Sequence, residues 1–242
     1  MRADPAAAPR LAALLAVLPA VIPAVFIGAC AAPPATDGPD WPVVVSLDLA
    51  RPEVASRFAC SDPAAWTWRD GALELTGASD YAPPHRSPRS IALLAEYTVG
   101  DFELEFEALQ TGREYGHRDL CVFFGFESPE RYYYVHLATT PDPNAHNVFL
   151  VDRAPRRNLA PVAERGVEWG TGEGHTVRVV RRGAVVEVSF DGETVLRAED
   201  ATIGEGRVGV GSFDDTGRFR RIRLRAPTAR FVRGASAPFS AP

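Results

Sequence analysis

Short stretches in which apolar and polar residues alternate recur along most of the chain. The clearest is residues 101–107, where Phe and Leu take every second position and acidic residues take the positions between them. Residues 176–181, 184–190 and 218–225 show the same alternation. Because successive side chains of a strand point to opposite faces, this pattern predicts strands that each bury one face.

Glycine-containing pairs separate the predicted strands. Asp70-Gly71 and Asp191-Gly192 each lie between two alternating segments, and Gly183 marks a third turn. Asp-Gly supplies the positive φ angles that a two-residue hairpin loop needs. After the N-terminal segment, no amphipathic stretch reaches about 12 residues, so few helices are expected. Many short strands with regular turns predict an all-β fold, a two-sheet antiparallel jelly-roll sandwich.

The N-terminal segment follows a different pattern. An uncharged apolar run from Leu11 to Ala29 comes after Arg2 and Arg10 and ends directly before Cys30. A basic stretch, an apolar stretch and small residues before a cleavage site are typical of an export signal, which the mature protein lacks. A membrane-spanning helix is the alternative, but it needs about 20 apolar residues, and prolines interrupt this run.

The end of this run, Ile27-Gly28-Ala29-Cys30, resembles the aliphatic–small–small–Cys box of bacterial lipoprotein signals. The resemblance implies cleavage before Cys30, a diacylglycerol on its sulfur and an acyl chain on its new amine. Several acyl chains form a stable anchor, whereas one chain holds only marginally. In lipoproteins an Asp after the Cys implies retention at the inner membrane, so Ala31 implies the outer membrane. An ordinary secretory signal remains an alternative.

The chain therefore divides into four expected segments. Residues 1–29 form the signal peptide, residues 30–42 the lipidated Cys30 and its tether, residues 43–226 the sandwich domain, and residues 227–242 a flexible tail. A net charge of −5 gives no overall attraction to nucleic acid. We expect contact with the membrane through the lipid anchor only.

Two cysteines remain in the expected mature domain, Cys60 and Cys121. In an oxidising compartment such a pair can form a disulfide. Cys121 lies in the middle of an apolar strand, however, where a free thiol packs as a small hydrophobe. The sequence leaves both alternatives open.

Several groups of residues resemble the concanavalin A-like, or laminin-G-like, jelly rolls. They are Trp66 with Asp70-Gly71 and Leu73, Tyr97 with residues 100–106, residues 132–135, and the later segments 175–179, 188–192, 206–211 and 219–224. The order is most similar to that of the 3-keto-disaccharide hydrolase domain, over about residues 43–226. The resemblance implies a jelly-roll fold and a reaction on a 3-keto-glycoside, by hydrolysis or elimination. Folds of this kind serve binding proteins and enzymes alike.

Polar residues cluster in the middle of the chain, between residues 113 and 152. Because sequential strands are usually neighbours, we expect these side chains to meet on one concave sheet face. The candidate catalytic residues are His136, Tyr134, His146 and Arg113. The candidate substrate-binding residues are His117, Asp119, Tyr132, Asn147 and Asp152.

This set of side chains suits carbohydrate. Aromatic rings stack on the apolar faces of sugars, and Asn, Asp, His and Arg hydrogen-bond hydroxyls or pair with uronate carboxylates. A neighbouring His and Tyr also suit proton transfer at a keto group. In the alternative interpretation, the tyrosines cover a sheet surface and the histidines lie in loops.

Acidic residues suggest two further sites. The glutamates of residues 101–107 are expected to face solvent; their spacing is similar to that of family-16 glycoside hydrolases, but it is also ordinary for a solvated strand. We expect no metal site: His117, His136 and His146 show no His-x-His pattern that would fix a divalent ion, and Asp214 and Asp215, with Asp48, are weak calcium candidates for which surface Asp in a turn is the alternative. We expect no cofactor, because nucleotide-binding, Gly-x-Ser-x-Gly and His-Glu-x-x-His motifs are absent from the sequence.

Three functions follow as hypotheses. The first is an envelope lipoprotein with a carbohydrate-active domain, possessing hydrolase activity on 3-keto-glycosides. The second is a non-catalytic module that binds oligo- or polysaccharide. The third is a structural envelope lipoprotein that contacts another protein. The sequence does not name the sugar.

Overall fold

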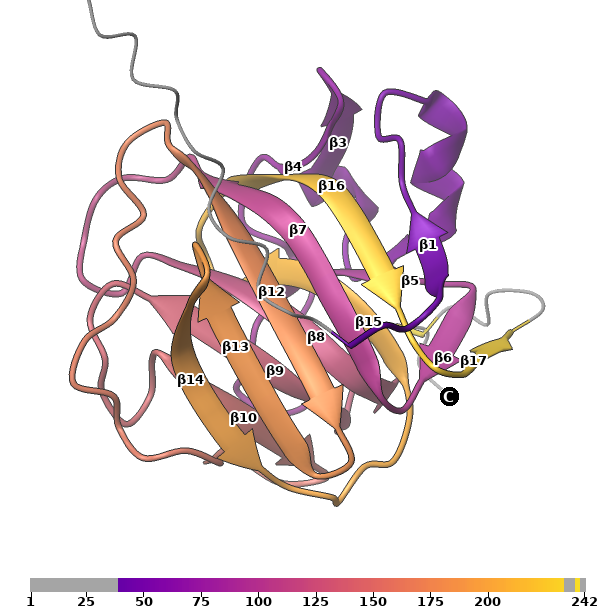
Figure 1. Ribbon diagram of the computed structural model, residues 1–242. Coiled ribbons are helices and arrows are strands. Elements are labelled where there is room, and N and C mark those ends of the chain that lie inside the picture. Colours follow the sequence, from indigo (N-terminus) through magenta and orange to yellow (C-terminus); the bar gives the residue numbers. More distant parts are fainter. Residues whose placement is uncertain (1–38, 233–237, 240–242) are drawn as a thin grey trace, which may run out of the picture. The chain divides into compact units, whose positions relative to one another are not determined.

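Two antiparallel β-sheets pack face to face, which confirms the predicted sandwich (Figure 1). The computed structural model describes residues 39–232 and 238–239, so the expected signal peptide and Cys30 lie outside the described residues. The described part contains two 3-10 helices, η1 (Pro52–Arg57) and η2 (Pro63–Ala65), and no α-helix. None of its helices has the length and apolar character needed to cross a bilayer.

The strands form two large sheets and one small one. The β7 sheet has the order β14 (Glu193–Glu199), β13 (Val185–Phe190), β12 (Gly174–Arg182), β7 (Phe102–Gln110), β16 (Gly217–Arg225), β4 (Ala72–Leu75) and β3 (Trp66–Arg69), with β1 (Val43–Ser46) pairing β16. The β8 sheet has the order β11 (Arg157–Asn158), β10 (Asn147–Asp152), β9 (Arg131–Ala138), β8 (Asp119–Ser128), β15 (Arg207–Ser212), β5 (Ser90–Leu94) and β2 (Phe58–Cys60). The small sheet joins β6 (Tyr97–Val99) to β17 (Ala229–Phe231).

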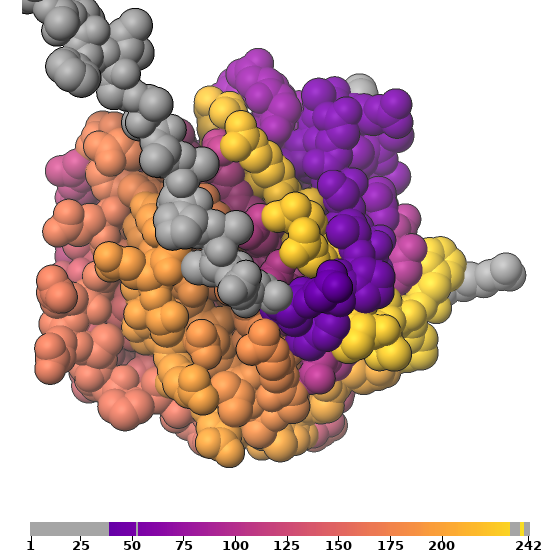
Figure 2. Space-filling view, viewed as in Figure 1, coloured from indigo at the N-terminus to yellow at the C-terminus, as the bar shows by residue number. Residues whose placement is uncertain are grey.

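The first strand of the described domain, β1, lies beside its last long strand, β16. β1 pairs antiparallel with β16, and Figure 2 shows the indigo and yellow segments side by side on this face. β17 falls within the stretch expected to be a flexible tail, where it pairs with β6. β16 therefore shares a sheet with β1, whereas β17 belongs to the separate small sheet.

The turn predictions are confirmed. The β3–β4 hairpin turns at Asp70 and Gly71, with φ of 53° and 67°, and the β13–β14 hairpin turns at Asp191 and Gly192, with φ of 50° and 86°. Gly183, at φ 58°, lies between β12 and β13. These positive φ angles are the ones that Gly and Asp adopt more readily than bulky residues.

The main core lies between the two large sheets. Phe102, Leu104 and Phe106 of β7 point into it and are almost fully buried. Phe102 meets Phe124 of β8 at 5.7 Å between ring centroids, and Phe124 stacks on Tyr133 of β9 at 4.9 Å. Burying each large apolar side chain stabilises the fold by about 1.5–3 kcal/mol, so this layer holds the sheets together.

Arginines on neighbouring strands neutralise the acidic row of β7. Glu103 accepts hydrogen bonds from Arg178 of β12 at 2.6 Å and from Arg225 of β16 at 3.2 Å. Glu105 pairs with Arg223. The row does lie opposite the core, but Glu103 is only 2% exposed, so the prediction that all three glutamates face solvent is wrong for Glu103. The long arginine stems cover it while their charges pair with it.

The β8 sheet is buried on both faces. A second apolar cluster covers its outer face, away from the β7 sheet, and consists of Ile91, Leu93, Cys121, Phe123, Phe126, Tyr132, Tyr134, Phe149 and Val151. Tyr81, Phe213 and Phe239 pack on top of this cluster. A strand buried on both faces has apolar residues in succession. β8 shows this in residues 120–124, Leu-Cys-Val-Phe-Phe.

Candidate functional site

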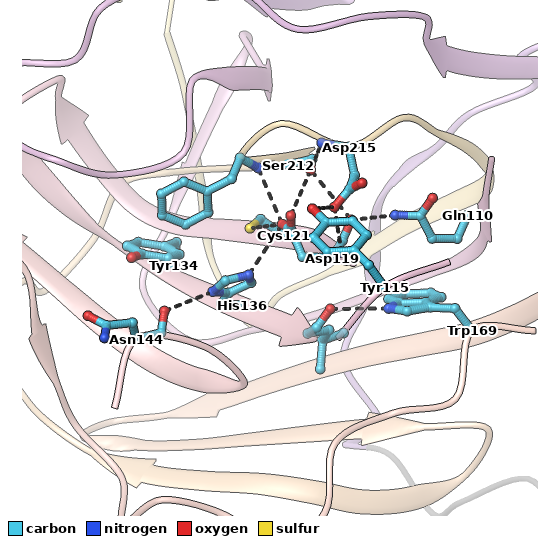
Figure 3. A network of polar contacts seen from close by, with 12 residues as sticks. Gln110, Tyr115, Asp119, Cys121, Tyr134, His136, Asn144, Trp169, Ser212 and Asp215 are labelled. Carbon is cyan, nitrogen blue, oxygen red and sulfur yellow. Dashed lines mark hydrogen bonds and ion pairs between the residues drawn. The ribbon is translucent and has the colours of Figure 1, made fainter. Parts of the chain in front are cut away.

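Three chemically active side chains meet at one end of β8 and β9 (Figure 3). Asp119 and Cys121 are two residues apart on β8, so both point to the outer face of the β8 sheet. His136 lies directly opposite Cys121 on β9. The carboxylate Oδ2 of Asp119 lies 3.1 Å from Cys121 Sγ and 3.5 Å from His136 Nε2. All three residues are buried.

Asp119 is also bonded to the turn that follows β15. Its Oδ1 accepts a hydrogen bond from the Ser212 hydroxyl at 3.1 Å, and its Oδ2 accepts one from the Phe213 N–H at 3.2 Å. The backbone N–H of Asp119 donates to Asp215 Oδ2 at 2.9 Å, and the Tyr115 hydroxyl donates to the same oxygen at 2.8 Å. Asp119 therefore joins β8 to residues far away in the sequence.

The environment changes the acid–base properties of this cluster. Burial raises the pKa of Asp119 well above its usual range, and the nearby carboxylate of Asp215 adds to the rise, although the Cys121 thiol hydrogen bond opposes it. Burial, together with the charge of Arg156, lowers the pKa of His136 to about 3, so its ring is neutral at physiological pH. Burial also raises the pKa of the Cys121 thiol. Perturbed pKa values of this kind concentrate at functional sites.

Tyr132, Tyr134 and His136 share the outer face of β9, but other side chains cover them. Both tyrosines are fully buried. Tyr134 stacks on Phe149 at 5.0 Å, and its hydroxyl accepts a hydrogen bond from Arg156 at 2.5 Å. The two tyrosines are therefore part of a packed aromatic layer, and the Arg156 guanidinium lies at the edge of that layer.

The candidates from β10 and the loop before it form no hydrogen bond with this cluster, although Asn147 lies directly opposite His136 in the sheet. His146 has a φ of 49° and a fully buried ring without hydrogen-bond partners. The side-chain amide of Asn147 donates to the carbonyls of Ala160 at 2.9 Å and Pro161 at 3.3 Å. Asp152 pairs with Arg131 at 3.0 Å at the other end of the strand. Asn147 and Asp152 hold chain segments in place in this structure.

The loop between β7 and β8 places two more candidates at the surface. Arg113 stacks over the Tyr115 ring, with 5.0 Å from its guanidinium carbon to the ring centroid. His117 Nε2 lies 3.0 Å from Asp142 Oδ2 in the loop between β9 and β10. These residues lie at the same end of the sandwich as Asp119, but on its solvent side.

A surface hollow of about 340 Å³ opens next to this loop. Its lining residues are Glu114, Tyr115, Gly116, Arg118, Thr139, Glu168, Trp169 and Gly170. Tyr115 is 37% exposed, and Glu114 and Glu168 are also exposed. Arg118 forms part of the floor, where it donates to the Gly170 carbonyl at 2.7 Å. We call this site the Tyr115 hollow.

The candidate calcium ligands occupy different positions. Asp214 pairs with Arg89, and Asp48 pairs with Arg51 at 3.8 Å. Asp215 accepts the hydrogen bonds from Tyr115 and Asp119. The structure therefore does not bring these carboxylates together.

The sequence reasoning missed several residues of the two sites. Tyr115, Glu114 and Glu168 lie in irregular loops, where no periodic pattern marks them. That Asp119 and Cys121 lie side by side could have been predicted from the sequence, because alternation along β8 puts both side chains on one face. The sequence left open whether Cys60 and Cys121 form a disulfide or remain free. In the structure both are free thiols.

No family model matches this chain, and no curated protein matches it. Among solved structures, the fold is similar to that of the carbohydrate-binding module CBM66 from Bacillus subtilis, at 13% identity and a TM-score of 0.55. That match covers 70% of this chain and 96% of the module.

Two further structures are similar. One is a protein of unknown function with a galectin-like fold from Bacillus subtilis, at 11% identity and a TM-score of 0.52, with 76% of this chain and 95% of that chain covered. The other is a glycosyl hydrolase candidate from Parabacteroides distasonis, at 14% identity and a TM-score of 0.52, with 75% and 99% covered. At these identities the likeness confirms the jelly-roll fold, and the narrower resemblance to the 3-keto-disaccharide hydrolase domain stays a prediction.

Proposed function

We propose that this protein is an exported envelope lipoprotein whose jelly-roll domain binds carbohydrate in the Tyr115 hollow. The jelly-roll fold, which it shares with a carbohydrate-binding module, is consistent with this function. Because a fold alone does not fix a function, the proposal depends on the side chains of the hollow.

The observation that carries the proposal is an exposed aromatic ring surrounded by polar groups. Tyr115 is 37% exposed, with the Arg113 guanidinium over one face of its ring, and Glu114 and Glu168 line the same hollow. A sugar can lay its C–H face on the ring while its hydroxyls donate to the two carboxylates. The carboxylates of Glu114 and Glu168 are accompanied by the guanidinium groups of Arg118 and Arg113, so charge does not select between a neutral and an acidic glycan.

Carbohydrate binding is tested by screening a glycan array with the purified protein and measuring the affinity for each glycan that binds. Tyr115→Ala should weaken binding at least about tenfold, the change expected from about 1.4 kcal/mol of lost stacking. Tyr115→Phe keeps the ring and should retain binding. Phe231→Ala is the matched control, because Phe231 is an exposed aromatic residue outside the hollow. Equal affinity of Tyr115→Ala and Phe231→Ala would remove the hollow from the binding site.

Hydrolysis is a second candidate function, favoured by the two carboxylates in the hollow. Glycoside hydrolysis uses such a pair as acid and base or nucleophile. For a 3-keto-glycoside, catalysis by His136 and Tyr134 would in addition require the substrate to displace the aromatic cover of the β8 sheet. Mass analysis of glycans and 3-keto-glycosides after incubation with the protein tests both ideas. Glu168→Gln should abolish turnover if the carboxylate pair acts.

Localisation is proposed from the N-terminal segment. Acylation of Cys30 would place the protein at the membrane, and Ala31 favours the outer membrane. Cys30→Ser should move the protein from the membrane fraction to the soluble fraction of the envelope. A variant that stays in the membrane fraction would contradict lipid anchoring at Cys30. Membrane attachment without glycan binding would favour the third hypothesis, a contact with another protein.

A further inference from the structure

Asp119, Cys121 and His136 present one oxygen, one sulfur and one nitrogen toward a common point (Figure 3). Each of the three donor atoms lies within 4.8 Å of the others. The three residues come from two paired strands, β8 and β9, so the backbone hydrogen bonds of the sheet fix their separation. A rigid sheet holds ligands more accurately than loops do.

The orientation of His136 points to a missing partner. Its Nδ1 lies 3.3 Å from the carbonyl oxygen of Asn144. Because a carbonyl only accepts hydrogen bonds, Nδ1 carries the proton and Nε2 keeps its lone pair. Nε2 is buried without a hydrogen-bond partner, in a side chain that is only 6% exposed. The lone pair of Nε2 faces the Asp119 carboxyl group at 3.5 Å, which can donate to it when protonated and offers only lone pairs when ionised.

We propose that Asp119, Cys121 and His136 bind one zinc ion. Zinc is bound in proteins by Cys sulfur, His nitrogen and carboxylate oxygen, whereas Mg²⁺ and Ca²⁺ use oxygen ligands. Bonds of about 2.0–2.3 Å in a tetrahedral site separate neighbouring ligand atoms by about 3.3–3.7 Å. The separations from Asp119 Oδ2, 3.1 Å to Cys121 Sγ and 3.5 Å to His136 Nε2, are close to that spacing.

The surrounding groups support this assignment. Zinc binding would release to water the proton of the Cys121 thiol and any proton on the Asp119 carboxyl group, and the resulting thiolate and carboxylate balance the two positive charges. The nearby cation Arg156 directs its hydrogen bonds to Tyr134 and the Asn144 carbonyl, not to the three ligands. The Asn144 carbonyl fixes the ring of His136, as outer partners of zinc-bound histidines do. Three protein ligands leave a fourth position for water.

The test uses the full chain with Cys30→Ser and Cys60→Ser, in which Cys121 is the only thiol. Titration with Co²⁺, a spectroscopic substitute for zinc, should produce a thiolate-to-cobalt charge-transfer band that saturates at one ion per chain. Added Zn²⁺ should remove the band and raise the Tm. Absence of the band together with an unchanged Tm would overturn the proposal, and this measurement needs no change in the cluster.

Variants identify the ligands. Adding Cys121→Ser should abolish the charge-transfer band, and adding His136→Gln should weaken Co²⁺ affinity at least about tenfold. His117→Ala is the control for metal bound at the exposed His117–Asp142 pair, and it should leave the band unchanged. Zinc affinity that survives Cys121→Ser undiminished, or that is lost in His117→Ala, would place the metal elsewhere and overturn the assignment.

Discussion

Asp200 provides a direct test of how the two large sheets are joined at one edge. It follows β14 of the β7 sheet, and its Oδ1 accepts hydrogen bonds from the Tyr133 hydroxyl at 2.5 Å and from the Thr202 N–H at 2.8 Å. Its Oδ2 accepts one from Arg157 at 2.7 Å. Tyr133 belongs to β9 of the β8 sheet, so the carboxylate links the two layers. The change Asp200→Asn removes the negative charge and keeps the size of the side chain.

The magnitude follows from the pKa of the carboxyl group. Partial burial alone would raise the pKa of Asp200, but hydrogen bonds from Tyr133, Thr202 and Arg157 lower it to about 2. Compared with about 3.9 in the unfolded chain, the difference corresponds to at most about 2.6 kcal/mol. We expect a loss of about 1–2 kcal/mol, because the Arg157 partner is exposed and its charge is screened by solvent.

The pH dependence has a definite sign. The folded pKa lies below the unfolded one, so the stabilisation is complete above about pH 5 and is lost as the pH falls through the folded pKa of about 2. Urea unfolding of the wild type and of Asp200→Asn, followed by tryptophan fluorescence, measures the free energy of unfolding at each pH. Asp70→Asn is the matched control, since Asp70 is exposed in a hairpin turn that Asn also suits.

The reasoning fails under either of two outcomes. One is that Asp200→Asn is no less stable than Asp70→Asn at neutral pH. The other is that its deficit persists undiminished at about pH 1, below the native pKa of about 2, where the carboxyl group is largely protonated.

Two further predictions concern backbone packing and a buried amide. Gly211→Ala would place a Cβ 1.9 Å from the Ser90 carbonyl oxygen, so we expect a loss above about 3 kcal/mol, whereas Gly204→Ala, with open space around it, should change stability by less than about 0.5 kcal/mol. Thermal unfolding of both variants checks this, and equal Tm values would contradict it. Asn147→Ala should cost about 1–3 kcal/mol, because its amide is bonded to both the N–H and the carbonyl of Ala160. Urea unfolding measures that loss, and a stability within about 0.5 kcal/mol of wild type would show that the hydrogen bonds between Asn147 and Ala160 are not needed for stability.

The two candidate sites have different relations to solvent. The Tyr115 hollow is open, whereas Asp119, Cys121 and His136 lie beneath an aromatic cover. The two sites are connected through Asp215, which accepts hydrogen bonds from the Tyr115 hydroxyl and from the backbone N–H of Asp119. Glycan binding and metal binding can therefore be measured separately, and an effect of zinc on glycan affinity would report coupling through Asp215.

The sequence by itself determined the strands, the hairpin turns and the sandwich class. Alternation is a local property: each residue of β7 or β12 is assigned a face by its neighbours in the strand, and Asp-Gly defines a turn without help from distant residues. The apolar succession in residues 120–124 is consistent with the burial of β8 on both faces, but we did not predict that burial from the sequence. The polar residues between 113 and 152, which we expected to meet on one concave sheet face, are instead divided among the buried cluster at His136, the surface loop at His117 and the far end of β10 at Asp152.

Only the tertiary structure decided which of those residues are accessible. Asp119 and Asp215 are 96 positions apart in sequence, yet their hydrogen bond helps to set the turn beside His136. Tyr134 looks like a sugar-stacking residue in the sequence, but Phe149 and Arg156 from other segments cover it. Burial depends on what a distant segment places against a strand face, and no pattern within the strand records that contact. The same reason explains why the exposed Tyr115, in an irregular loop, was found only in the folded chain.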